Sequence, residues 1–187
     1  DDVFHSLYFF HKVTINNTFQ LDKHVSCTFT DVGHIIGSAA IHLDIEENGE
    51  QKRILFSGDV GRYNDEILKA PTAFPESDYV ILESTYGNSL HDDVAITDQM
   101  LLDVITDTCI RKKGRVIIPS FSVGRTQELV YALNRLHHQN KLPDIPFFVD
   151  SPLSVEATRV VKEHPECYNE KILQFMQYDP EPFEFER

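Results

Sequence analysis

The sequence predicts an α/β protein in two parts, in which mostly antiparallel strands are followed by a parallel sheet with helices. Two observations support this fold class. Before residue 57, apolar and polar side chains alternate, as they do in half-buried strands. After residue 79, short continuous apolar runs alternate with segments of helical periodicity, which is typical of strand–helix–strand units. The 41% of hydrophobic residues is enough for a core.

The first part, residues 13–57, is expected to be mainly β structure. Val25–Thr30 and Ala40–Ile45 alternate and are rich in residues that favour strands. Asn48–Gly49 predicts a tight hairpin turn, because both residues tolerate a positive φ. Arg53–Phe56 is then the returning strand of the hairpin.

The second part is expected to alternate strands and helices. Tyr79–Leu82 is a continuous apolar run, which suits a strand in a sheet covered on both faces. Further strands are expected at Val116–Pro119 and Pro146–Val149. The expected helices are Val94–Arg111, Ser122–His138, Val155–Glu163 and Tyr168–Gln177. Short loops between these elements predict a parallel sheet with right-handed crossovers.

An acidic composition limits how this chain could bind nucleic acid. The formal net charge is −13, from 17 Lys and Arg against 30 Asp and Glu. Bulk charge of this sign repels the phosphate backbone. A nucleic-acid substrate would therefore require metal ions or a local basic strip, which we expect near Arg62, Arg115 and Arg125.

Cysteine spacing and hydropathy favour a cytoplasmic protein. Cys27, Cys109 and Cys167 are far apart and form no Cys-x-x-Cys pair. This argues against a disulfide framework or a cysteine-type zinc site, and for a reducing compartment. No apolar run reaches the roughly 18 residues needed to span a bilayer.

Three short glycine-containing motifs each place one metal-capable or acid/base side chain directly after an apolar run. The side chains are His34, Asp59 and Glu83. The motifs are GHIIGSA (33–39), FSGDVGR (56–62) and LESTYG (82–87). Together they point to a metal-dependent hydrolase site built from loops at strand ends.

His34 and Asp59 are the candidate metal ligands. A neutral imidazole is a natural zinc ligand, although a histidine at a strand end can also simply bond a loop. Asp59 follows an expected buried strand, where carboxylates are rare unless they are paired or bind metal. It could bridge two divalent ions about 3.5–4 Å apart, an arrangement that favours in-line displacement at phosphorus. The alternative is an Asx-turn at a strand–loop junction.

Glu83 is the candidate acid/base residue. It lies at the carboxyl end of an expected parallel strand, where open α/β sheets place their ligand sites. A carboxylate there could orient a histidine acid or accept a hydrogen bond from the substrate. The alternative is a surface glutamate or one that caps a helix.

A strand-to-helix loop, residues 119–125, is a candidate substrate-binding segment. Backbone N–H groups at a helix N-terminus bind phosphate, and an arginine adds bidentate pairing. The candidate residues are Ser120, Ser122, Gly124 and Arg125, with Ser151 at the equivalent end of the next expected strand. The alternative, which is compatible with phosphate binding, is a helix cap with Ser122 as the N-cap.

Taken in order, these motifs resemble the β-CASP subgroup of the metallo-β-lactamase fold, the RNA-processing nucleases related to the cleavage-and-polyadenylation endonuclease and to RNase J. The similarity includes RVIIPSFSVGRTQELVYAL (115–133) and FFVDSPL (147–153), and runs from about Phe19 to about Cys167. It implies a partial αββα sandwich followed by a parallel-sheet β-CASP segment. Residues 1–88 would be the C-proximal part of the first metallo-β-lactamase segment, and residues 89–187 the N-terminal part of the β-CASP domain.

The resemblance also implies roles for the candidate residues. His34 matches a zinc ligand, Asp59 matches the carboxylate shared by both zinc ions, and Glu83 matches an acid that supports a histidine general acid. The Ser120–Arg125 loop matches a segment of the substrate cleft. The family's His-x-His-x-Asp-His motif is absent from the sequence and is expected upstream of Asp1, and two later histidines are expected beyond Arg187.

The leading hypothesis is therefore a zinc-dependent phosphodiester hydrolase that acts on RNA. The chain by itself is expected to be an inactive fragment with weak or absent zinc, because two ligands fall short of the three or four that zinc sites use. An open sheet edge at the cut is expected to recruit a partner, as a homodimer or by swapping. The alternatives are a non-catalytic scaffold subunit and a DNA-acting nuclease of the same fold.

Overall fold

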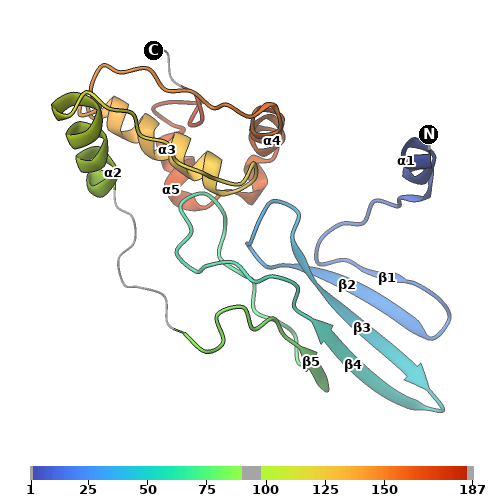
Figure 1. The fold of residues 1–187 in the computed structure, drawn as a ribbon. Coiled ribbons are helices and arrows are strands. Elements are labelled where there is room, and N and C mark those ends of the chain that lie inside the picture. The colour runs from blue at the N-terminus through green and yellow to red at the C-terminus, as the bar shows by residue number, and fades with distance from the viewer. Residues whose placement is uncertain (1, 90–97, 185–187) are drawn as a thin grey trace. The chain divides into compact units, whose positions relative to one another are not determined.

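The computed structural model of the chain describes residues 2–89 and 98–184 and divides into two compact units (Figure 1). Unit 1 consists of Asp1–Tyr63 and Ala70–Thr85, and unit 2 consists of Asn64–Lys69 and Tyr86–Arg187. The segment 64–69 thus belongs to unit 2, although unit 1 precedes and follows it in the sequence. Within the described residues, no helix is long and apolar enough to cross a membrane.

Unit 1 is built on one five-stranded sheet whose strand order follows the sequence. The strands are β1 (Thr18–Gln20), β2 (Val25–Asp31), β3 (Ala39–Glu47), β4 (Glu50–Phe56) and β5 (Tyr79–Ile81). Strands β1 to β4 pair antiparallel, and β5 pairs parallel to β4. The prediction of a mostly antiparallel first part is confirmed. Asn48 and Gly49 form the expected hairpin turn, with φ values of 54° and 79°.

The buried face of this sheet carries an unusual histidine. Val32, Ala40 and Leu55 form its apolar core, with Phe74 packed against them. His42 lies directly opposite Leu55 and is only 6% exposed. Neither of its ring nitrogens has a hydrogen-bond partner in the described part of the chain. Burial lowers the pKa of His42, against an opposing effect of Asp44, so the imidazole is neutral at pH 7.

Strand β5 differs from its prediction in burial. The composition of Tyr79–Leu82 suggested a strand covered on both faces, but Val80 is 56% exposed and Ile81 is 53% exposed. The reason is that β5 is the edge strand of the sheet, so its apolar side chains meet neighbours on one side only. The α-helix α1 (Asp2–Ser6) and the 3-10 helix η1 (Leu7–Phe9) precede the sheet.

Unit 2 is helical in its described residues. Its elements are α2 (Asp98–Ile105), the π-helical η2 (Thr106–Arg111), α3 (Arg125–His138), α4 (Pro152–Lys162), η3 (Pro165–Cys167) and α5 (Glu170–Phe175). All four expected helices are present with shifted ends, and residues 94–97 of the first lie outside the described part. Helices α2 and α3 enclose a core of Leu101, Ile105, Leu133, Leu136 and Leu142.

The parallel sheet expected in the second part is absent from the described residues. Val116–Pro119 and Pro146–Val149 have strand-like composition, yet neither run pairs with a neighbour. Ile117 is 87% exposed and Phe148 is 85% exposed, so these side chains do not enter a packed layer. Strand propensity reflects packing on a half-buried surface, and without a neighbouring strand it does not produce a ladder.

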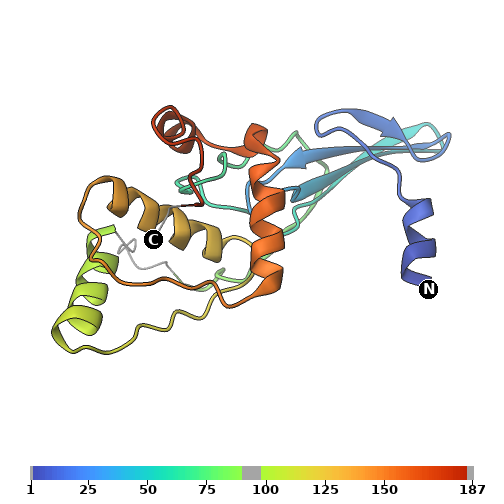
Figure 2. The same ribbon diagram turned by 90° about the horizontal axis from the view of Figure 1, so that it is seen from above.

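Helix α4 lies beside the amino end of α3, as Figures 1 and 2 both show. The buried side chain of Gln127 in α3 donates to the Thr158 hydroxyl of α4, at 2.9 Å. The same amide group also donates to the Ser122 carbonyl at 3.0 Å, while its oxygen accepts from the Gly124 N–H at 2.7 Å. One side chain therefore fixes both the start of α3 and its neighbour.

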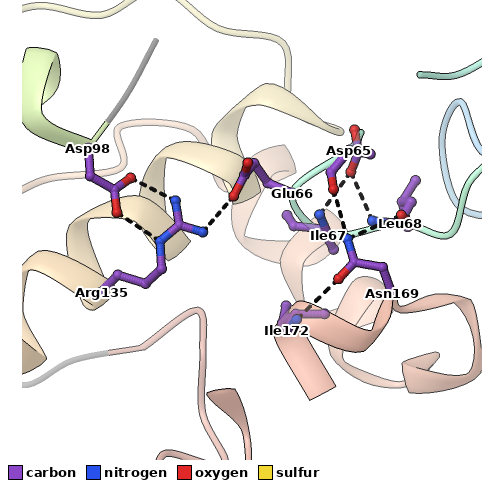
Figure 3. A network of polar contacts seen from close by, with 8 residues as sticks. All are labelled: Asp65, Glu66, Ile67, Leu68, Asp98, Arg135, Asn169 and Ile172. Atoms are coloured by element: carbon purple, nitrogen blue, oxygen red, sulfur yellow. Dashed lines mark hydrogen bonds and ion pairs between the residues drawn. The ribbon is translucent and has the colours of Figure 1, made fainter. Parts of the chain in front are cut away.

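The segment 64–69 is held in unit 2 by polar contacts (Figure 3). Asn169 donates from its side chain to the Asp65 carbonyl at 2.8 Å and caps α5 by accepting from the Ile172 N–H. Arg135 of α3 bonds Glu66 at 2.7 Å and grips Asp98 of α2 with two nitrogens, at 2.7 and 2.9 Å. These contacts join the segment to two helices.

Candidate functional site

The direction of the strands explains why three of the predicted site residues gather in unit 1. Strand β3 is antiparallel to both β2 and β4, so β2 and β4 run in the same direction, and β5 is parallel to β4. The carboxyl ends of β2, β4 and β5 therefore meet at one edge of the sheet. His34 follows β2, Asp59 follows β4 and Glu83 follows β5.

His34 and Asp59 lie next to each other at this edge. The His34 Nε2 atom is 3.9 Å from Asp59 Oδ2, and the side chains are 45% and 72% exposed. The high exposure of Asp59 differs from the sequence argument, which expected a buried carboxylate. The physical reason is that Gly58, with a φ of 58°, turns the chain out of β4 before the aspartate is reached.

The loops that carry the two residues are in close contact. The Gly61 N–H donates to the Val32 carbonyl at 2.8 Å. A Cβ atom on Gly61 would lie 2.0 Å from the Gly33 carbonyl oxygen, so only glycine permits this approach. On the histidine side, the Ser38 hydroxyl accepts from the His34 N–H at 3.1 Å. The position of the histidine thus depends on both loops.

Glu83 contacts the aspartate loop through the backbone. Its Oε1 accepts from the Val60 N–H at 2.9 Å. This bond, followed by one from the Thr85 side chain, lowers the pKa of Glu83, and His34 adds a weaker effect in the same direction. Glu83 is therefore a carboxylate at pH 7, which suits it to accept hydrogen bonds and to orient a histidine rather than to donate a proton.

His34 and Asp59 fit a shared metal ion as part of a ligand set. Zinc binds histidine nitrogen and carboxylate oxygen at about 2.0–2.2 Å in tetrahedral sites, so two ligand atoms of one ion lie about 3.4 Å apart. The observed separation is 3.9 Å, and a small rotation of either exposed side chain closes the difference. Within the described residues no group of three His, Cys, Asp or Glu could hold an ion, so the pair would need ligands from elsewhere.

The candidate substrate loop lies in unit 2 and satisfies many of its own polar groups. The Gly124 N–H is bonded to Gln127, and the Ser120 and Thr126 hydroxyls are 2.8 Å apart. Arg125 pairs with Glu128 at 2.9 Å. A phosphate at this helix start would have to displace these intramolecular bonds.

Ser122 was predicted to cap a helix, whereas Ser151 was predicted only to line the cleft, and the structure reverses the capping roles. Ser122 is not the N-cap of α3, because the helix begins at Arg125 and the Gln127 side chain takes over the capping. Ser151 does cap α4, since its hydroxyl accepts from the Ser154 N–H at 3.2 Å and proline follows it. The Ser151 hydroxyl oxygen thus already accepts one hydrogen bond, from the first turn of α4.

Sequence reasoning missed Ser38, Ser57 and Gly61, which position the site without supplying a ligand. The sequence does carry one signal for two of them: a small residue lies within two positions of Asp59 on either side. That signal indicates a tight turn but does not say which backbone groups the turn brings together.

Comparison with known proteins identifies the family of the chain. Residues 126–187 match the model of the Beta-Casp domain. An RNase J-like protein of Methanocaldococcus jannaschii is 34% identical over 167 residues, which cover 88% of this chain and 38% of the relative. A ribonuclease of Thermus thermophilus is 34% identical over 75% of this chain and 30% of its own length.

A plant protein is similar at the same level. Subunit 3-I of the Arabidopsis thaliana cleavage and polyadenylation specificity factor is 36% identical over 145 residues, 75% of this chain and 20% of the subunit. The chain therefore spans between a fifth and two fifths of the length of these relatives. The chain belongs to the β-CASP family, a group within the metallo-β-lactamase proteins.

Proposed function

We propose that the whole protein containing this chain is a metal-dependent ribonuclease that hydrolyses phosphodiester bonds, with zinc as the metal. The observation that supports this best is the 3.9 Å approach of His34 to Asp59 at a sheet edge shared with Glu83. Three relatives are named as a ribonuclease, an RNase J-like protein and a cleavage factor subunit, and family membership implies metal dependence in general.

In this proposal His34 and Asp59 would hold the metal, and Asp59 would serve as a ligand to both ions. Bound zinc would supply Lewis acidity at the phosphoryl group and lower the pKa of a water molecule. Glu83 remains ionised, because the Val60 N–H lowers its pKa, and orients a histidine acid from another part of the protein. Substrate RNA contacts Ser120, Ser122, Gly124, Arg125 and Ser151.

The proposal extends to the fold and setting of the whole protein. One face of the sheet carries a row of paired apolar residues, Ile41, Phe56 and Ile81, that are between 37% and 53% exposed. This row supports an αββα sandwich in which a further layer covers it, with a boundary near residue 88. A homodimer or swapped packing through an open sheet edge and a cytoplasmic location complete the proposal.

The test compares Asp59→Asn with Asp22→Asn in the full-length protein. Asp22 is a matched control because it lies in the same unit and its side chain bonds a turn. We expect Asp59→Asn to reduce cleavage of a labelled RNA at least 100-fold and to reduce bound zinc by elemental analysis. The control should retain both.

Three results would contradict the proposal. The first is an active protein whose cleavage survives Asp59→Asn and full metal removal. The second is a wild-type protein that binds zinc and RNA without cleaving it, which would support the scaffold alternative. The third is preferential cleavage of a DNA oligonucleotide of the same sequence, which would make the enzyme a deoxyribonuclease.

A further inference from the structure

Ser57 is the most deeply buried hydroxyl near the candidate site, at 1% exposure. It follows the last residue of β4, and its N–H donates to the Ile81 carbonyl at 2.9 Å, which extends the pairing of β4 with β5 by one step. Its side chain therefore points from the junction of the two strands that lead to Asp59 and Glu83.

The Ser57 hydroxyl makes two bonds, one to each of the loops that follow. It accepts from the Glu83 N–H at 3.1 Å and donates to the Gly58 carbonyl at 2.7 Å. Glu83 in turn accepts from the Val60 N–H at 2.9 Å. The backbone from Ser57 to Val60, the hydrogen bond from Val60 to the Glu83 side chain and the hydrogen bond from the Glu83 N–H to Ser57 together form a closed ring.

Asp59 occupies the middle of this ring. The Gly58 carbonyl before it is held by Ser57, and the Val60 N–H after it is held by Glu83. The carboxylate itself makes no bond within the ring and remains 72% exposed. Its backbone is thus fixed on both sides while its oxygens stay available to a ligand.

We infer that Ser57 is a positioning residue that couples Asp59 to Glu83. Through one hydroxyl it sets the register of the two loops, so that the metal ligand and the histidine-orienting carboxylate keep a constant separation. This inference rests on the proposed function for its kinetic consequence. The hydrogen-bonded ring itself can be tested in a protein of any activity.

The kinetic test uses Ser57→Ala in the full-length protein with a labelled RNA substrate. Removing the hydroxyl leaves the Glu83 N–H and the Gly58 carbonyl without their partner, and both loops relax. We expect kcat to fall between about 10-fold and 100-fold with KM changed less than threefold, because misplacement of catalytic groups by about 1 Å costs rate in this range. Ser57→Thr keeps the hydroxyl and should retain more activity than the alanine variant.

Tyr168→Phe is the matched control. It removes one buried hydroxyl of unit 2, which donates to the Val161 carbonyl at 2.6 Å and takes no part in the ring. It should lower stability without a selective loss of kcat. Equal kcat losses in the two hydroxyl deletions, or no recovery in Ser57→Thr, would reduce Ser57 to a structural role and overturn the inference.

Amide hydrogen exchange tests the ring without reference to activity. In the unmodified protein, the N–H groups of Glu83 and Val60 should be protected and should exchange with the same opening free energy. Ser57→Ala should accelerate both by a similar factor, while Tyr168→Phe should leave them unchanged. Independent or unprotected exchange of the two amides would refute the coupling, even if cleavage of RNA were confirmed. Wild-type protein without ribonuclease activity would instead refute the proposed function and leave the ring intact.

Discussion

Gly61→Ala tests whether the contact between the His34 and Asp59 loops sets the site. The added Cβ would lie 2.0 Å from the Gly33 carbonyl oxygen and 2.7 Å from the His34 nitrogen, where real contacts stay above 3.0 Å. The loops must therefore separate by about 1 Å, since neither obstacle is a flexible side chain. Overpacking and the lost Gly61 N–H bond together cost about 2–4 kcal/mol.

The same shift predicts a functional loss. The His34 and Asp59 atoms are 3.9 Å apart, and two ligand atoms of one tetrahedral zinc ion lie about 3.4 Å apart. A further displacement of about 1 Å along that line puts the two atoms beyond the reach of one ion, so under the proposed function the zinc affinity of the full-length protein should fall at least tenfold. Zinc titration against a competing chelator measures this. Stability is measured by hydrogen exchange of unit 1 amides, because two units need not unfold together.

Gly49→Ala is the control for replacing a glycine. Gly49 has a φ of +79° and open space around its Cβ position, so alanine there costs backbone strain of about 1–2 kcal/mol and moves neither site loop. Gly61 lacks a positive φ and should nevertheless be the more sensitive position. Equal stability losses and equal zinc affinities in the two variants would refute the idea that loop contact sets the metal ligands.

Three further predictions concern stability. In the wild-type protein, burial lowers the folded-state pKa of His42, so below about pH 6.5 the unfolded chain binds more protons and stability falls as the pH falls. His42→Leu removes the titrating group and should therefore abolish this part of the pH dependence. Urea midpoints at pH 7.5 and 5.5 should diverge in wild type and converge in the variant. Arg135→Met should destabilise unit 2 by about 2–4 kcal/mol, because it leaves Asp98 and Glu66 without their shared cation, and Arg135→Lys should recover only part of this in denaturant titration. Asn169→Ala should cost about 1–2 kcal/mol through the lost α5 cap and should speed exchange of the Leu68 and Lys69 amides; unchanged exchange would show that the cap alone is lost.

The antiparallel part of the fold could be predicted from the sequence because its signals are local. Alternation places β2 and β3 within one or two residues, and the Asn48–Gly49 pair fixes the hairpin. The prediction of strands at Val116–Pro119 and Pro146–Val149 was wrong, because strand pairing depends on residues far away in the sequence. An apolar run shows that a segment suits a sheet, but only a neighbouring strand completes its hydrogen bonds.

The site was predictable in composition more than in geometry. A metal-capable or acid/base side chain near a glycine at a strand end selected His34, Asp59 and Glu83 as candidates. Their convergence depends on the strand order, which makes β2, β4 and β5 end at one edge. Ser57 and Gly61 escaped notice because their effects are exerted through backbone groups far away in the sequence.

The exposure of Asp59 changes the reason for regarding it as functional. The sequence argument was that a carboxylate after a buried strand needs a partner, but this side chain is 72% exposed and needs none for solvation. The structure constrains its backbone instead. Ser57 bonds the carbonyl before Asp59, Glu83 bonds the N–H after it, and Gly61 lets the loop pack closely against Gly33. A surface aspartate without a function gains nothing from such restraint, which costs conformational entropy. A metal ligand does gain affinity, because a carboxylate whose backbone is already fixed loses less conformational freedom when the ion binds.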